Sequence, residues 1–204
     1  MRSELYLTKD NTGNKAEEWL SIIDRKRKWK SAPKKTLLLV LDMQRFFLEP
    51  ESHAYVPSGR AMIPRLREFI GGFHGPVIFT KHVKGSSGNL MREWWRDIPE
   101  GELSEIVPEL APLAETIIEK EHYSAFHGTE LDSMLSSQGI DSVLISGVLT
   151  DLCCESTARG AFMRGYRTYF IADLTATATE ERHISTLKVI SNAFGEVIPS
   201  KVIK

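Results

Sequence analysis

Residues 143–159 read VLISGVLTDLCCESTAR and hold the most informative pattern in the chain. A short apolar run leads through a glycine into residues with helical periodicity, which predicts a strand, a tight loop and a helix. Thr150 or Asp151 is the predicted N-cap, which places Cys153 in the first helical turn. A thiol there faces free backbone N–H groups and the positive end of the helix dipole, so we expect its thiolate to be favoured.

Cys153 has two interpretations at this stage. Free cysteine is among the most buried residue types, and a lone cysteine in a strand–helix unit is commonly a packing residue. The thiolate is also the nucleophilic form of cysteine, and a turn that follows a strand is a suitable place for a nucleophile. Cys154 points elsewhere, because neighbouring helical residues do not share a face, and we interpret it as a core residue.

Two other apolar runs end on a charged residue. Residues 36–42 end at Asp42, and residues 116–120 end at Lys120. Continuous apolar runs are typical of the buried strands of a parallel sheet, whose carboxyl ends form the ligand crevice where the strand order reverses. We therefore expect Asp42, Lys120 and Cys153 to meet there as the parts of a thiol-based catalytic site. For each charged residue alone, a solvated position at a strand end is the alternative.

Strand and helix patterns alternate along the chain. Strands are predicted at 35–42, 76–80, 116–120, 142–146, 166–171 and 196–198, with helices between them and a further amphipathic helix at 16–24. This alternation predicts an α/β fold, a parallel sheet of about six strands with helices on both faces. Residues 1–34 precede the first strand and form a predicted N-terminal extension, and the long stretch 85–107 has no regular pattern.

Composition limits the function classes. The chain has 204 residues, a formal net charge of −1 and two adjacent cysteines. A near-neutral chain gives no electrostatic case for binding nucleic acid or an anionic membrane, and we interpret the basic stretch 25–30 as a solvated helix end. No apolar run is long enough to span a bilayer. Adjacent cysteines form no disulfide framework, and the first residues lack the apolar region of a signal peptide, so we expect a cytoplasmic protein.

Loop residues near the strand ends are candidates for binding a substrate. They are Phe47, His53, His82, Trp94 and Trp95. The tryptophans could wall a pocket in which Arg92 or Arg96 holds a carboxylate, or they could form a hydrophobic plug or a subunit contact. The chain has no GxGxxG or Walker sequence and no CxxC or HExxH, so we predict neither a nucleotide site nor a structural zinc.

Three segments together resemble the isochorismatase-like cysteine hydrolase superfamily. They are LDMQ at 41–44, Lys120 followed by SAFHGT at 124–129, and GVLTDLC at 147–153 followed by TAR at 157–159. Gly165, Tyr166 and Asp173 also match the pattern, and the resemblance runs from about residue 36 to residue 197. It implies a three-layer, Rossmann-like αβα hydrolase domain over residues 35–204. It also implies a small-molecule substrate and a homo-oligomer, a dimer or a tetramer.

The resemblance also implies roles for individual residues. Cys153 would be the nucleophile, Asp42 the base and Lys120 the cation beside them. A non-proline cis peptide would join Val148 to Leu149, and the backbone N–H groups of Leu149 and Cys153 would form the oxyanion hole. These roles are those of a cysteine hydrolase that works through a thioester.

The presence of Cys153 favours hydrolysis of a small amide, ureido or related C–N bond. Members that cleave the vinyl ether of isochorismate usually lack this cysteine, and that reaction is one alternative. A non-catalytic binding or redox-sensing domain is another. Nicotinamidases of the superfamily bind a metal through an Asp and several His, whereas KHVK at 81–84 offers only His82. We therefore predict no required metal, and no other cofactor.

Overall fold

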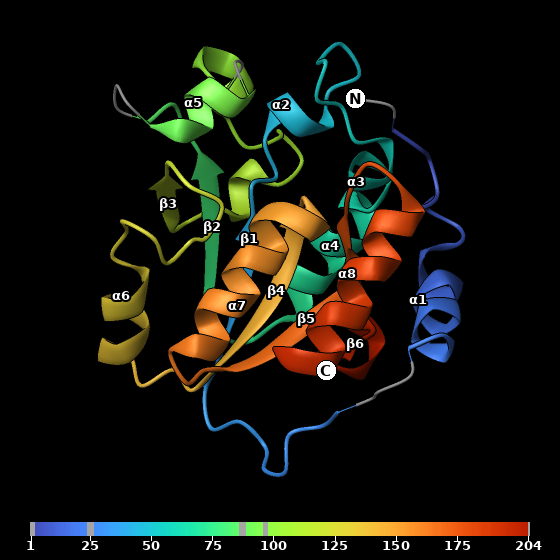
Figure 1. Ribbon diagram of the computed structural model, residues 1–204, viewed down its shortest axis with the longest axis vertical. Helices are drawn as coiled ribbons and strands as arrows, with labels where there is room; N and C mark the ends of the chain where they lie inside the picture. The colour runs from blue at the N-terminus through green and yellow to red at the C-terminus, as the bar shows by residue number, and fades with distance from the viewer. Residues whose placement is uncertain (1–2, 24–26, 86–88, 96–97, 204) are drawn as a thin grey trace.

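The sheet of this computed structural model, which describes residues 3–23, 27–85, 89–95 and 98–203, contains six parallel strands (Figure 1). Their order is β3-β2-β1-β4-β5-β6. The strands are β1 (Thr36–Leu41), β2 (Val77–His82), β3 (Ile117–Lys120), β4 (Ser142–Val148), β5 (Arg167–Ala176) and β6 (Glu196–Ile198). The predicted parallel sheet of about six strands is confirmed.

The two central strands, β1 and β4, explain the apolar runs in the sequence. Residues 37–41 of β1 and all of β4 are buried, because other layers cover both faces of the sheet. β1 pairs with β2 on one side and with β4 on the other, so the strand order reverses between β1 and β4. The carboxyl ends of these two strands therefore border the crevice in which open α/β sheets bind ligands.

Helices cover both faces of the sheet. They are α1 (Thr12–Ser21), α2 (Arg45–Leu48), α3 (Pro57–Ala61), α4 (Ile63–Gly72), α5 (Leu90–Trp95), α6 (Leu131–Ser137), α7 (Glu155–Met163) and α8 (Glu180–Ala193). Figure 1 shows α7 and α8 across the near face and α4 behind the sheet, while the short α2 and α5 lie beyond the arrowhead of β2. In the described part of the chain, no helix has the length and apolar character that crossing a bilayer requires.

The turn after β4 differs from the prediction. Residues Thr150–Cys154 form a π-helical turn with Leu149 as its N-cap, and α7 begins only at Glu155. Neither predicted cap binds the turn's own N–H groups. The Thr150 hydroxyl pairs with the ring of His183 on α8, and the Asp151 carboxylate accepts a hydrogen bond from Thr177. Both side chains bind residues distant in the sequence and cap no helix. Cys153 therefore lies in a turn that precedes the α-helix.

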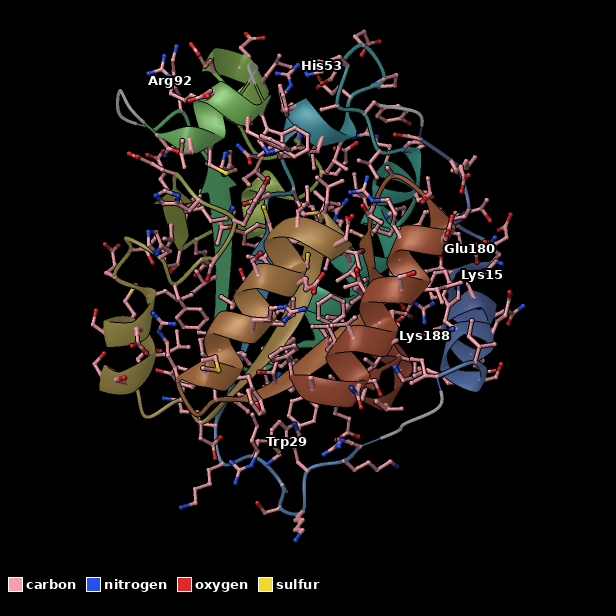
Figure 2. The ribbon with its side chains drawn as sticks, in the orientation of Figure 1. Lys15, Trp29, His53, Arg92, Glu180 and Lys188 are labelled. Carbon is pink, nitrogen blue, oxygen red and sulfur yellow. The ribbon has the colours of Figure 1, made fainter. Side chains whose placement is uncertain are left out.

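The N-terminal segment packs on the domain. α1 buries Ala16 and Trp19 and lies beside α8, where the ammonium of Lys15 is 2.9 Å from a carboxylate oxygen of Glu180 (Figure 2). In the stretch predicted to be irregular, α5 and a 3-10 turn at Gly101–Ser104 occur. The sequence predicted a solvated helix end at 25–30 and offered Arg96 as a partner for a carboxylate. Of these, residues 25, 26 and 96 lie outside the described residues.

Candidate active site

Asp42, Lys120 and Cys153 meet at the carboxyl edge of the sheet, as the strand pattern predicted. The ammonium Nζ of Lys120 lies 2.7 Å from Oδ2 of Asp42 and 3.3 Å from Sγ of Cys153. Both charged side chains are fully buried, and Cys153 is 5% exposed. A buried ion pair in contact with a thiol is a costly arrangement for a fold to maintain, and perturbed ionisable groups of this kind cluster at functional sites.

Charge and burial determine the protonation states of the site. Burial favours the neutral carboxyl of Asp42, but the Lys120 ammonium, His82 and the hydrogen bond with Cys153 together hold the pKa of Asp42 below its ordinary value. Burial likewise opposes the Lys120 ammonium, but its interactions with Asp42 and Cys153 together raise the pKa of Lys120. The pKa of Cys153 is raised, by burial first and by the charge of Asp42 second. The resting site therefore holds an ion pair beside a neutral thiol.

The expectation that the helix N-terminus would favour the Cys153 thiolate is therefore wrong. Cys153 is in the π turn ahead of α7, and burial has a larger effect on its pKa than any nearby positive charge. A thiol in this state needs a base to remove its proton. Asp42 is in contact with it and is ionised, so the two groups fit together as thiol and base.

Neighbouring residues hold the Asp42 carboxylate in place. Asp42 has a positive φ of 51°, and its Oδ1 accepts a hydrogen bond of 2.6 Å from the Thr80 hydroxyl on β2. Two residues on, the buried Gln44 side chain donates to the backbone oxygens of His82 and Ser104 and accepts from the N–H of His82. These bonds join the chain after β1 to the end of β2, so the carboxylate is fixed relative to two strands.

Gly147 brings β4 close to β1. Its φ is +112°, and a Cβ at this position would lie 2.1 Å from the carbonyl oxygen of Leu41. Only glycine allows both this backbone conformation and this approach. The result is that the turn carrying Cys153 begins directly beside the residue that precedes Asp42.

A cavity of about 170 Å³ opens on the Cys153 thiol. It is lined by Phe46, Phe47, His53, Ala54, His82, Met91, Trp95, Ile98, Pro99, Tyr123, Leu149, Leu152 and Cys153. Aromatic and aliphatic side chains make up most of this wall, and no lysine, arginine, aspartate or glutamate is among the described residues that line it. The site is therefore a small apolar cavity with the Cys153 thiol in its wall.

Four of the five predicted pocket residues line this cavity: Phe47, His53, His82 and Trp95. Trp94 does not, because its side chain is 78% exposed and it neighbours Trp95 on the short helix α5, where adjacent residues face different ways. Arg92, on the same helix, is not among the lining residues either.

Tyr123 is a lining residue that the sequence reasoning missed. Its hydroxyl accepts a hydrogen bond of 2.6 Å from Nε1 of Trp95, which connects α5 to the loop after β3. Tyr123 lies three residues after Lys120, in a loop, so no periodic pattern marks it. Only its place just after a strand that ends on Lys120 could have marked it.

The backbone after β4 has the geometry that the resemblance implies. The peptide bond between Val148 and Leu149 is cis. Leu149 lines the cavity next to Cys153, and its carbonyl accepts hydrogen bonds from the N–H groups of Leu152 and Cys154. The backbone of Leu149 is therefore part of the cavity wall on the side of the thiol.

The two cavity histidines do not fit the metal-binding set that the resemblance would supply. His53 and His82 both line the cavity, and burial together with the Lys120 charge lowers the pKa of His82 to about 4, so its ring is neutral. Within the described ranges, however, no group of three His, Cys, Asp or Glu side chains is placed to hold a metal ion. Two histidines alone supply fewer protein ligands than a catalytic zinc site ordinarily has.

Comparison with known proteins gives one consistent result. The family model described as the isochorismatase domain matches residues 36–202. The chain is 38% identical to nicotinamidase 3 of Arabidopsis thaliana over 131 residues, 60% of this chain and 66% of that protein. Alignments span 62% to 66% of the length of the first curated relatives that the chain matches, less than two thirds of each.

Solved structures agree with the sequence match. A cysteine hydrolase from Pseudomonas syringae pv. phaseolicola 1448A superposes with a TM-score of 0.77 at 28% identity, over 86% of this chain and 94% of that one. N-carbamoylsarcosine amidase from Thermoplasma acidophilum superposes with a TM-score of 0.71 at 26% identity, over 81% and 96%. With the family model covering most of its length, this chain belongs to the isochorismatase family.

Proposed function

We propose that this protein is a cysteine hydrolase that cleaves the C–N bond of a small amide or ureido compound. The observation that carries the proposal is the buried Asp42–Lys120 pair in contact with the Cys153 thiol at the end of an apolar cavity. Similarity to a nicotinamidase and to an N-carbamoylsarcosine amidase, both named for C–N substrates, supports the same reaction class.

The reaction proceeds in two halves. Asp42 takes the Cys153 proton while the sulfur forms a bond to the carbonyl carbon, and the carbonyl π electrons move to the oxygen. Backbone N–H groups of Leu149 and Cys153 hold that oxyanion, a contribution of about 3 kcal/mol per donor in related chemistry. The C–N bond then breaks, the amine receives the proton from Asp42, and a thioester remains.

Water completes the cycle. Asp42, ionised again, takes a proton from a water molecule whose oxygen attacks the thioester carbon. The carbon–sulfur bond breaks, the sulfur regains the proton, and the acid product leaves. Lys120 stays protonated throughout, where it stabilises the charge on Asp42 or on the sulfur.

The cavity supports a compact and uncharged substrate. Its volume of about 170 Å³ and its apolar wall suit a small ring or a short alkyl amide. A charged group that enters such a cavity loses its hydration without gaining an opposite charge, which is costly. We therefore expect a neutral amide to be preferred over an analogue that carries an added carboxylate.

A vinyl-ether hydrolase of an isochorismate-like compound is the second candidate, and the family match is the observation that favours it. The two reactions make different demands on the thiol. Cleavage of a vinyl ether needs an acid such as protonated Asp42, after which water adds to the oxocarbenium carbon and no protein nucleophile takes part, so Cys153→Ala would retain that activity while Asp42→Ala would lose it. Amide hydrolysis requires both residues.

The test is turnover and acyl-enzyme trapping on a panel of neutral amides, each paired with an analogue that bears an added carboxylate. We expect neutral amides to turn over, Cys153→Ser and Asp42→Asn to lose activity, and rapid quenching to reveal an adduct on Cys153 by mass spectrometry. Cys154→Ala is the matched control, because Cys154 is a buried thiol outside the lining of the cavity. Retained activity in Cys153→Ala would contradict the proposal.

We further propose a cytoplasmic homo-oligomer. Both cysteines are free thiols, in agreement with a reducing compartment. On α5, Leu90 is 75% and Trp94 78% exposed, and aromatic and aliphatic groups that project in this way are typical of subunit contacts. Light scattering coupled to size exclusion tests this, and a monomer at micromolar concentration would overturn it.

A further inference from the structure

A buried aromatic cluster supports the nucleophile turn from behind. Nδ1 of His183, in the first turns of α8, lies 2.9 Å from the hydroxyl of Thr150, the first residue of the turn that carries Cys153. The His183 imidazole is itself enclosed, with its centroid 4.4 Å from the Trp19 ring and 5.7 Å from the Tyr6 ring. His183, Thr150 and Trp19 are fully buried.

The N-terminal segment is tied to this part of the molecule by specific hydrogen bonds. The Tyr6 hydroxyl accepts from the N–H of Thr177 at 2.8 Å, and Nε1 of Trp19 donates to the carboxylate of Glu180 at 2.8 Å. On the other side, the Ser58 hydroxyl accepts from the N–H of Tyr6 and donates to the carbonyl of Glu4. The segment is therefore anchored on both sides of the ring cluster.

The turn has a second tie to the same region. The Asp151 carboxylate, next to Thr150, accepts a hydrogen bond from the Thr177 hydroxyl and pairs with Arg182. Thr177 is also the residue whose N–H binds Tyr6. The start of the nucleophile turn, the start of α8 and the N-terminal segment thus form one connected unit, which none of the proposed chemical steps uses.

We propose that His183 is a positioning residue, which fixes the Cys153 turn through Thr150, and that Tyr6 and Trp19 of the N-terminal segment hold its ring in place. This inference rests on the proposed function only for its effect on turnover. The hydrogen bond is buried, so losing one partner leaves the other unsatisfied, whereas replacing both with apolar groups can be nearly neutral. The turn should therefore respond to either partner alone.

The experiment is a double-mutant cycle with His183→Phe and Thr150→Val. Phenylalanine keeps a ring between Tyr6 and Trp19, and valine keeps the shape of threonine. Hydrogen exchange of a peptide covering 149–154 is the readout that needs no substrate. We expect each single variant to speed exchange about tenfold and the double variant to be no worse than either single one. His183→Asn, whose amide can reach the position of Nδ1, should stay near wild type.

Turnover is the second readout. On any amide that the enzyme accepts, His183→Phe should lower kcat about tenfold with KM changed less than threefold, since the ring is outside the cavity lining. Trp19→Leu should act in the same direction. Trp29→Leu is its matched control, because Trp29 lies at the end of the molecule away from α2 and α5 and its Nε1 donates to the Thr168 carbonyl near the start of β5 (Figure 2).

The outcomes separate the two proposals. Unchanged exchange in both single variants, or effects that add in the double variant, would overturn the positioning role. If the variants show the expected exchange pattern but the wild-type protein turns over no amide, the positioning role stands and the proposed function is overturned.

Discussion

Asp42 and Lys120 should shift the ionisation of Cys153 in opposite directions. The charge of Asp42 raises the pKa of this thiol and the charge of Lys120 lowers it. Asp42→Asn should therefore lower the pKa of Cys153 and Lys120→Met should raise it. The pH midpoint of Cys153 alkylation, followed by mass spectrometry in a Cys154→Ala background, measures both. Asp42→Asn should still lose about 10²–10⁴-fold in turnover, because it removes the base.

The contrast between these two readouts is informative. If thiolate content alone set the rate, Asp42→Asn would be the faster enzyme. An Asp42→Asn variant with raised turnover, or with an unchanged alkylation midpoint, would contradict the assignment of Asp42 as the base in direct contact with the thiol.

At the residue level, the sequence predicted the positions of those side chains that lie at the ends of strands. Asp42 and Lys120 each close an apolar run, so the parallel sheet alone brings them to one edge near Cys153. The sequence could not predict that burial would keep the thiol neutral, because this depends on all the residues that enclose Cys153. The contact between His183 and Thr150 was also beyond it, since 33 residues separate the two partners.

At the level of elements, Gly147 is the position at which β4 should tolerate least change. Gly147→Ala would place a Cβ 2.1 Å from a backbone oxygen of β1, at a φ that L side chains rarely adopt. We expect a loss of at least about 3 kcal/mol in the free energy of unfolding, measured with urea. Gly71→Ala is the control: it lies in α4 with nothing near its Cβ and should be neutral or stabilising by up to about 1 kcal/mol.

The turn after β4 shows why element boundaries were harder to predict than elements. Thr150 and Asp151 are good N-cap residues by type, yet their side chains bind His183 and Thr177 instead. The predicted strand at 166–171 continues to Ala176, and its pairing with β4 shifts register between Phe170 and Thr175. In both cases partners distant in the sequence override the local preference.

At the scale of the whole molecule, stability should fall in mild acid. Burial lowers the pKa of His183 to about 3, and burial with the Lys120 charge lowers that of His82 to about 4, while both titrate near 6.5 when unfolded. Below about pH 6.5 the unfolded chain therefore binds more protons than the folded one. Each histidine then reduces the free energy of unfolding by up to about 1.4 kcal/mol per pH unit until its folded pKa is reached.

His183→Asn tests this directly, because it removes one of the two contributions. Urea unfolding between about pH 5 and pH 7.5 should give a slope against pH that is smaller than that of wild type by up to about 1.4 kcal/mol per unit. An unchanged slope would mean that the imidazole of His183 is protonated in the folded protein.

Complete burial of the Asp42–Lys120 pair also governs how the site responds to its surroundings. Raising the ionic strength from about 0.01 M to about 1 M shrinks the Debye length from about 30 Å to about 3 Å, yet no mobile ion can enter the space around these two groups. An exposed pair such as Arg159–Glu155 is screened over that range. The protonation of Asp42 and Lys120 should therefore be insensitive to salt, and the proposed chemistry should keep the same electrostatic environment in dilute buffer and in brine.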